Sequence, residues 1–244
     1  MIIDGFNKLT LLDYPGYTAC IIFTRGCNFN CNFCQNSTLI KADKSAGLIN
    51  KEEVLEYLKK RKGILDGIVI SGGEPTIQKD LIRFIEEIKK LNLKVKLDTN
   101  GYNPKVLKYL IEHNLIDYIA MDIKHTFINY KDIIKKNIVI EKIIESINLI
   151  KDSKIDHEFR TTIIKEHHSL ENIIEIIEFI GKTEKYYLQN FEDSDNVNCR
   201  NLHGFSDDEL IKLENALKKH SKNIKIRGIL NENYQVKERE NCYV

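Results

Sequence analysis

The most informative absences in this 244-residue sequence are those of net charge and of long apolar segments. Its 37 basic and 36 acidic side chains leave a net charge of +1, which favours neither nucleic acid nor an anionic membrane surface as a partner. No apolar run approaches the length of a membrane span, and the first ten residues lack the basic and apolar parts of a signal peptide. We therefore expect a cytoplasmic protein that binds neither membrane nor nucleic acid.

Linker-like segments are absent as well. There is no tryptophan, there are only 3 prolines, and no segment rich in Ser, Gly or Pro divides the chain. Hydrophobic residues at 42% and charged residues at 30% are typical of a globular chain with a sizeable core. We expect one domain over residues 1–244, with a core of about residues 15–230.

Short apolar runs alternate with helical patterns along the chain. Strands are expected at residues 17–23, 67–71, 93–98, 117–122, 157–164, 186–191 and 223–228. One helix is expected to begin at Asn50, with Glu53 completing a capping box, and to end at Gly63. Further helices are expected over residues 81–88, 106–111, 140–150, 170–180 and 207–219. Ser206 and Glu209 predict a capping box for the last helix, and residues 189–205 a long loop.

This order of elements predicts an α/β fold, a partial (β/α)6 TIM-like barrel of parallel strands with outer helices. In such folds the chemistry takes place at the carboxyl ends of the strands.

Three of the six cysteines follow the first predicted strand with the spacing C-x3-C-x2-C: Cys27, Cys31 and Cys34. In a reducing compartment, clustered cysteines indicate metal ligands or redox catalysts. One alternative is a buried helical face, although the interleaved asparagines disfavour a helix. Another is a zinc site with a fourth ligand from Cys199, Cys242 or a histidine. The third is a [4Fe–4S] cluster that keeps one iron open for a substrate or cofactor.

With Phe33, the segment resembles the C-x3-C-x-aromatic-C signature of the radical S-adenosylmethionine (SAM) superfamily. The resemblance implies that the three thiolates hold a [4Fe–4S] cluster. It also implies that the amino and carboxylate groups of SAM chelate the fourth iron, and that Phe33 packs near the adenine.

Polar residues also follow later strands. Gly72 and Gly73 permit close backbone approach to a ligand, although an ordinary strand-to-helix turn would look the same. Asp98 and Asp122 each close an apolar strand, so both carboxylates should face one pocket, where they need a cation or several donors. A stabilising ion pair at the barrel rim is the alternative, and Lys124 is a candidate partner.

Arg160 lies in a β-branched run, so it should point into a polar cavity or pair with a carboxylate. His167 and His168 follow that strand and either face the pocket or lie at the surface. Gln189 is a candidate contact to substrate or adenosine.

These strand ends resemble the GGEP, DTNG and D-x-K motifs of glycyl-radical-enzyme activases. The resemblance implies that Gly72 and Gly73 contact the SAM amino group, with Glu74 holding the loop or joining that contact. It implies SAM contacts for Asp98 and Lys124, and a contact from Arg160 to the SAM carboxylate or ribose. It further implies a monovalent cation held by Asp98, Thr99 and Asp122.

The family resemblance is closest to activases of anaerobic ribonucleotide reductase. It covers residues 5–36 and the later segments DYIAMDIK, FRTTI and YYLQNF. One departure is Gln35, where many members of that group have His. The resemblance implies reductive cleavage of SAM to a 5′-deoxyadenosyl radical, which generates a glycyl radical on that reductase, with flavodoxin or ferredoxin as reductant. The alternatives are an activase of another enzyme, such as the pyruvate formate-lyase type, and a radical SAM enzyme acting on a small molecule or peptide. A non-catalytic zinc or iron–sulfur module is a further alternative.

The other three cysteines lack the spacing of a second, ferredoxin-like cluster. Cys20 is expected to be a buried small hydrophobe. Cys199 and Cys242 are expected to be incidental thiols, a redox role being the alternative.

Overall fold

The computed structural model describes residues 1–41, 47–193, 197, 199 and 201–229. Its eight strands form one sheet in sequence order, with the first strand antiparallel to the second and all later neighbours parallel. The strands are β1 (Ile3–Thr10), β2 (Ala19–Thr24), β3 (Gly67–Gly72), β4 (Lys94–Thr99), β5 (Tyr118–Asp122), β6 (Asp156–Ile163), β7 (Tyr186–Asn190) and β8 (Ile224–Arg227). In the described residues β1 and β8 do not pair, so the barrel stays open.

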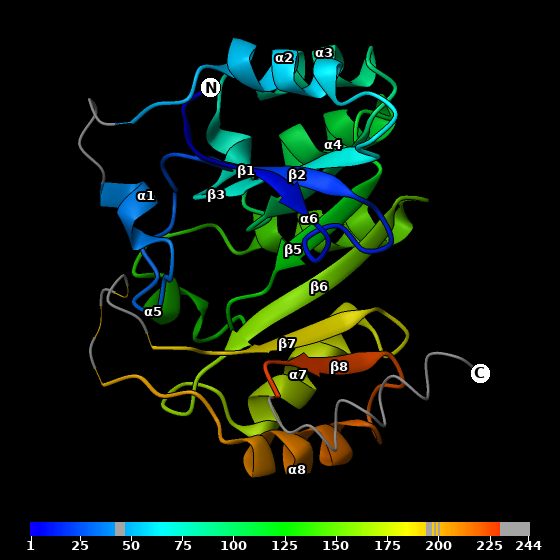
Figure 1. Ribbon diagram of the computed structural model, residues 1–244. Helices are drawn as coiled ribbons and strands as arrows, with labels where there is room; N and C mark the ends of the chain where they lie inside the picture. Colours follow the sequence, from blue (N-terminus) through cyan, green and yellow to red (C-terminus); the bar gives the residue numbers. More distant parts are fainter. Residues whose placement is uncertain (42–46, 194–196, 198, 200, 230–244) are drawn as a thin grey trace.

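Each parallel crossover contains a helix, and these helices lie around the outside of the curved sheet (Figure 1). They are α2 (Lys51–Lys60), α3 (Leu81–Lys89), α4 (Pro104–Glu112), α6 (Glu141–Asp152), α7 (Leu170–Ile180) and α8 (Asp207–Leu217). Two short helices, α1 (Ser37–Lys41) and α5 (Tyr130–Ile134), lie near the carboxyl ends of the strands, at the left of Figure 1. A 3-10 turn covers Pro75–Ile77. The predicted partial (β/α)6 barrel is confirmed.

The sequence did not predict β1. Only Ile3 of this strand is fully buried, and the rest is half-buried or exposed, so it lacks the apolar signal of a core strand. Helix ends were predicted more closely. Asn50 caps α2, but its side chain accepts from the backbone N–H of Glu52, so the box with Glu53 does not form. The capping box of Ser206 and Glu209 is present.

Alternation along the strands separates two environments. Val95, Leu97 and Ile119 pack with the helices in the main core, whereas Tyr118 and Ala120, one residue away, belong to a small second cluster. The second set faces the barrel interior, and the same alternation carries Lys96 and Asp98 inward. Interior side chains thus form a column that ends at the carboxyl edge of the sheet.

Beyond Asn190, the described part of residues 189–205 contains neither helix nor strand, as expected of a loop. In the described parts of the chain, no helix combines the length and apolarity needed to cross a membrane. The extent of the single predicted domain stays a prediction.

Candidate active site

A cavity of about 230 Å³ opens at the carboxyl ends of the strands. The cysteine loop and the ends of β3, β4, β5, β6 and β7 line it. Every residue to which the sequence gave a cluster, SAM or cation role lies in its wall: Cys27, Cys31, Phe33, Cys34, Gly72, Gly73, Glu74, Asp98, Thr99, Asp122, Lys124, Arg160 and Gln189. This convergence follows from the parallel strands, whose carboxyl ends meet at one edge.

The three cysteines lie in a loop between β2 and α1 that contains no helix, so the buried helical stripe is excluded. Backbone bonds hold this loop: the N–H of Gly26 donates to the carbonyl of Leu39 at 2.9 Å, and that of Asn30 to Ile134 at 3.0 Å. Burial raises the pKa of the Cys27 thiol to about 12 and that of Cys31 to about 11. Metal binding to these sulfurs therefore has to displace protons.

The thiol arrangement bears on the kind of metal group. Among residues 1–41, 47–193 and the later described positions, no three His, Cys, Asp or Glu side chains converge on one ion position. Such a geometry does not support a mononuclear zinc centre, which needs close tetrahedral ligands. The three thiols line one cavity, as the ligands of a cluster would. Cys242 lies outside the described residues.

The glycines at the end of β3 lie against the cysteine loop. A Cβ atom on Gly73 would come within 2.0 Å of the carbonyl oxygen of Gly26, and one on Gly72 within 2.2 Å of the backbone nitrogen of Thr24. These glycines allow the backbone of β3 to lie directly against a neighbouring segment of the chain. Both also line the cavity, where a ligand could approach them. A side chain at Gly73 would displace the cysteine loop, and one at Gly72 would displace the end of β2.

Glu74 ties the end of β3 to that of β4. Its fully buried carboxylate accepts the Thr99 hydroxyl at 2.8 Å, the Asn100 backbone N–H at 2.7 Å and the Thr76 backbone N–H at 3.1 Å. Burial raises its pKa, although these hydrogen bonds oppose the shift. Of the two roles implied for Glu74, these contacts correspond to holding the loop.

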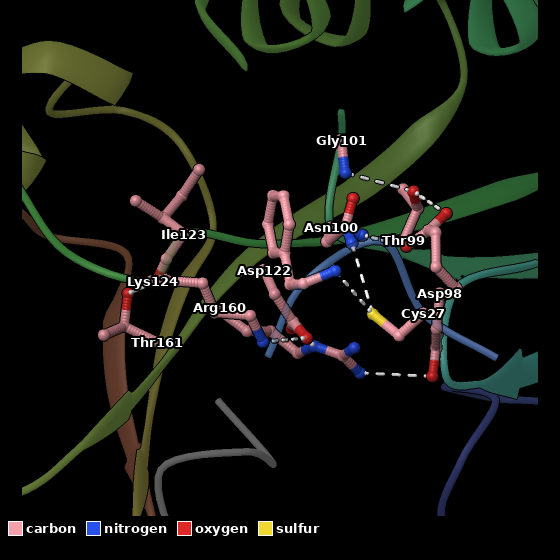
Figure 2. Close-up of polar contacts among 12 residues, drawn as sticks. Cys27, Asp98, Thr99, Asn100, Gly101, Asp122, Ile123, Lys124, Arg160 and Thr161 are labelled. Atoms are coloured by element: carbon pink, nitrogen blue, oxygen red, sulfur yellow. Dashed lines mark hydrogen bonds and ion pairs between the residues drawn. The ribbon is translucent and has the colours of Figure 1, made fainter. Parts of the chain in front are cut away.

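Arg160 bridges the two aspartates that the sequence placed in one pocket (Figure 2). Its Nε lies 2.9 Å from Asp122 Oδ1, and its Nη1 3.4 Å from Asp98 Oδ2. Lys124 lies 3.0 Å from the other oxygen of Asp122, and Lys96 2.7 Å from that of Asp98. Burial acts to raise the pKa of Asp122, but Arg160 and Lys124 outweigh it and lower that pKa to about 2. Both aspartates stay ionised.

The group therefore has three cations, Lys96, Lys124 and Arg160, for two aspartates, so it suits an added anionic group such as a carboxylate. The monovalent cation stays a prediction. Asp98, Thr99 and Asp122 share the cavity, but protein donors already occupy the aspartate oxygens, and the Thr99 hydroxyl donates to Glu74.

The histidines lie behind the cavity wall rather than in it. His168 is 3% exposed; its Nδ1 accepts the N–H of Ile164 at 3.2 Å, and its Nε2 lies 3.2 Å from the carbonyl oxygen of Lys124. Burial, and then the charge of His125, lowers the pKa of His168 to about 4. His167 contacts the amide of Asn32 in the cysteine loop at 3.1 Å. Both support the site from outside.

Sequence reasoning assigned no role to Lys96 and Asn100. Lys96 could have been found, because it lies two residues before Asp98 on the same strand face. Asn100 is part of the recognised DTNG motif, but the direction of its side chain depends on the fold. Cys20 is fully buried, as expected, and Cys199 donates its backbone N–H to Asn32 in the cysteine loop at 3.1 Å.

Comparisons with known proteins agree with this site. Residues 21–180 match the family described as the Radical SAM superfamily. A Methanocaldococcus jannaschii protein named "Putative glycyl-radical enzyme activating enzyme MJ1227" is 34% identical over 238 residues, covering 93% of this chain and 96% of that protein. A "GTP 3',8-cyclase" of Helicobacter pylori is 27% identical over 226 residues, 87% of this chain and 65% of that protein.

A solved structure shows the same fold. The radical SAM methyltransferase from Sphaerobacter thermophilus superposes with a TM-score of 0.70 at 15% identity, covering 91% of this chain and 69% of that one. Family membership implies a [4Fe–4S] cluster and SAM as cofactors. The chain belongs to the radical SAM superfamily and is a radical SAM enzyme.

Proposed function

We propose that this enzyme is a glycyl-radical-enzyme activase, and that its partner is the anaerobic ribonucleotide reductase. One observation carries the proposal: three cysteines, a glycine turn and a bridged aspartate pair from successive strand ends line one cavity. The similarity to a protein named as a glycyl-radical enzyme activating enzyme supports the choice of activase.

Cys27, Cys31 and Cys34 would hold the cluster, and three ligands from one loop would leave one iron open for SAM. When bound, the reduced cluster and SAM supply a 5′-deoxyadenosyl radical that removes hydrogen from the Cα of a glycine. No side chain has to act as an acid or base. The protein binds and orients the reacting groups, and it excludes water from them.

The surrounding residues would orient SAM. Arg160 is held between two carboxylates, so its guanidinium is fixed in direction and suits the SAM carboxylate or ribose. Lys124 and Asp98 would contact SAM beside it, and Gly72 and Gly73 would present backbone groups to its amino group. The remaining assignments are Phe33 near the adenine, Gln189 at the adenosine or substrate, and Asp98, Thr99 and Asp122 at a monovalent cation.

The partner's glycine must reach this cavity within a protein loop. The gap between β1 and β8 leaves the barrel unclosed, which is compatible with entry of such a loop. A flavodoxin or ferredoxin would supply the electron, and the reaction would take place in the cytoplasm.

The decisive experiment mixes the anaerobically reconstituted protein, reductant and SAM with an anaerobic ribonucleotide reductase. Electron paramagnetic resonance should then detect the doublet of a glycyl Cα radical, and 5′-deoxyadenosine should accumulate. A doublet with a pyruvate formate-lyase-type enzyme alone would reassign the partner. Absence of 5′-deoxyadenosine, despite a SAM-bound cluster, would refute the activase proposal.

The similarity to the cyclase favours a second candidate, a radical SAM enzyme that acts on a small molecule such as GTP. The same reduced protein, incubated with SAM and GTP, tests it by chromatography. Consumption of GTP without radical transfer to any glycyl radical enzyme would favour this candidate.

A further inference from the structure

The sulfur of Cys27 receives two N–H donors from the protein. The backbone N–H of Phe29 lies 3.3 Å from Sγ. The side-chain amide of Asn100 lies 3.8 Å from it, and Figure 2 shows this residue beside the sulfur. The first is local to the cysteine loop. The second comes from the end of β4, 73 residues away, so the fold brings it to the sulfur.

The Asn100 side chain has little freedom to turn away. It is 5% exposed, and its Oδ1 accepts the backbone N–H of Tyr102 at 3.0 Å. Because Oδ1 of Asn100 accepts this bond, the NH2 group points the other way, toward Cys27. The same NH2 group also donates to the side-chain oxygen of Asn28 at 2.7 Å. The backbone N–H of Asn100 is anchored on Glu74 at 2.7 Å. The donor is thus held in place before any ligand binds.

A fixed donor beside a ligating sulfur changes the energy of adding an electron. Reduction increases the negative charge on a cluster and its thiolates, and an N–H group pointing at sulfur stabilises that charge. Removal of the donor should therefore make the reduction potential more negative. The buried carboxylate of Glu74 contributes indirectly, because it fixes the backbone from which Asn100 extends.

We propose that Asn100 is a positioning residue whose amide donates to the Cys27 thiolate and raises the reduction potential of the cluster. The inference rests on the proposed cluster assignment and adds to it. Glu74 and Tyr102 fix the donor, and Asn28 takes its second hydrogen. Because Asn100 lies outside the cysteine motif, it can change the reduction potential without any change in the residues of that motif.

The test is a redox titration of the reconstituted full chain, followed by electron paramagnetic resonance. For Asn100→Ala, the ratio of reduced to oxidised cluster at a fixed potential should fall about tenfold, a shift of about 59 mV for one electron. Asn28→Ala is the comparison variant, because it keeps the Asn100 donor but removes a side-chain oxygen that lies 3.8 Å from the same sulfur and 2.7 Å from the Asn100 amide. Loss of this partly negative atom should not make the potential more negative, so the two variants should differ in the direction of their shifts.

An independent readout is the exchangeable hydrogen itself. In D2O, electron–nuclear double resonance of the reduced cluster should detect deuterons near Cys27, and the Asn100→Ala protein should lose one of these couplings. If Asn100→Ala fails to hold a cluster, Asn100→Asp keeps the shape and the acceptor for Tyr102 but replaces the donor. Its potential should be more negative as well.

An unchanged potential in the assembled Asn100 variants, or equal shifts in Asn100→Ala and Asn28→Ala, would overturn the inference. A different result marks failure of the proposed function: the unaltered protein would assemble no [4Fe–4S] cluster or would not cleave SAM. The two failures are therefore distinguishable in one set of samples.

Discussion

The two ends of the barrel interior are built from the same strands but from different chemistry. At the carboxyl end, β4, β5 and β6 present Asp98, Asp122 and Arg160, all ion-paired. At the amino end, Tyr14 from the β1–β2 turn packs on Tyr118 and a small apolar set: Ala19, Ile21, Val69 and Ala120. Along β5, only four residues separate Tyr118, in the aromatic cluster that forms the floor of the barrel, from Asp122 in the charged cavity.

Polar satisfaction differs between the ends as well. At the carboxyl end, each aspartate oxygen has a cationic partner. At the amino end, the buried hydroxyl of Tyr14 has no hydrogen-bond partner among the described residues. The amino end also holds a buried charge, because the Tyr118 hydroxyl donates to Glu158, which pairs with Arg227. The contrast is therefore between a cavity wall of paired charges and a tyrosine cluster that combines packing with this ion pair, as expected when one end binds ligands and the other stabilises the barrel.

The largest expected effect is at the carboxyl end, in the cysteine loop. Cys31→Ala should abolish both iron–sulfur assembly and cleavage of SAM, because it removes one of three ligands. Iron and sulfide analysis, with assay of 5′-deoxyadenosine, measures this. Cys20→Ala is the control, since this buried thiol lies in β2 outside the motif and its loss should leave both quantities intact. Cleavage by the Cys31 variant would contradict the ligand assignment.

Removal of the bridging cation should come next. Arg160→Leu leaves Asp98 and Asp122 buried with less compensation, and we expect a loss of about 3–5 kcal/mol in the free energy of unfolding. Urea titration of the cluster-free protein measures it. Arg160→Lys keeps the positive charge but loses the planar guanidinium that contacts both aspartates, so the loss of unfolding free energy should be smaller. A loss below about 1 kcal/mol for Arg160→Leu would show that the charges do not depend on this bridge.

His168, behind the cavity wall, should make stability pH-dependent. Its pKa is about 4 in the folded protein against about 6.5 when unfolded, so the unfolded chain takes up its proton first. The resulting stabilisation is complete above about pH 6.5 and is lost as the pH falls towards 4, about 3 kcal/mol in all.

Urea titrations between pH 7 and 4 measure this dependence, which His168→Gln should weaken. His113→Gln, at an exposed position, is the control and should retain the dependence of the unaltered protein. An equal slope in the His168 variant would rule the assignment out.

The smallest effect is expected at the barrel floor. Tyr14→Phe removes an unpartnered buried hydroxyl while keeping the ring against Tyr118, so stability should change by less than about 1 kcal/mol or increase. Thermal and urea unfolding of both proteins measure it. A larger loss would mean that this hydroxyl is hydrogen-bonded in solution, by water for example, and would weaken the contrast between the two ends.

Much of the architecture was predictable because its signals are local. Seven apolar runs separated by helical periods indicated the parallel strands, and their shared carboxyl edge brought the thirteen assigned residues to one cavity. β1 was missed because an edge strand with one buried residue has no such signal. The site roles themselves stay proposals.

The sequence by itself determined the order of the seven parallel strands and the helices between them, the cysteine motif and which strand ends carry charge, since these depend on spacing and residue type. Only the tertiary structure decided that Glu74 spans two strand ends, that Arg160 bridges both aspartates, and that Asn100 points at Cys27. The physical reason is competition: each polar group has several partners within reach, and only the packed distances between strands select among them.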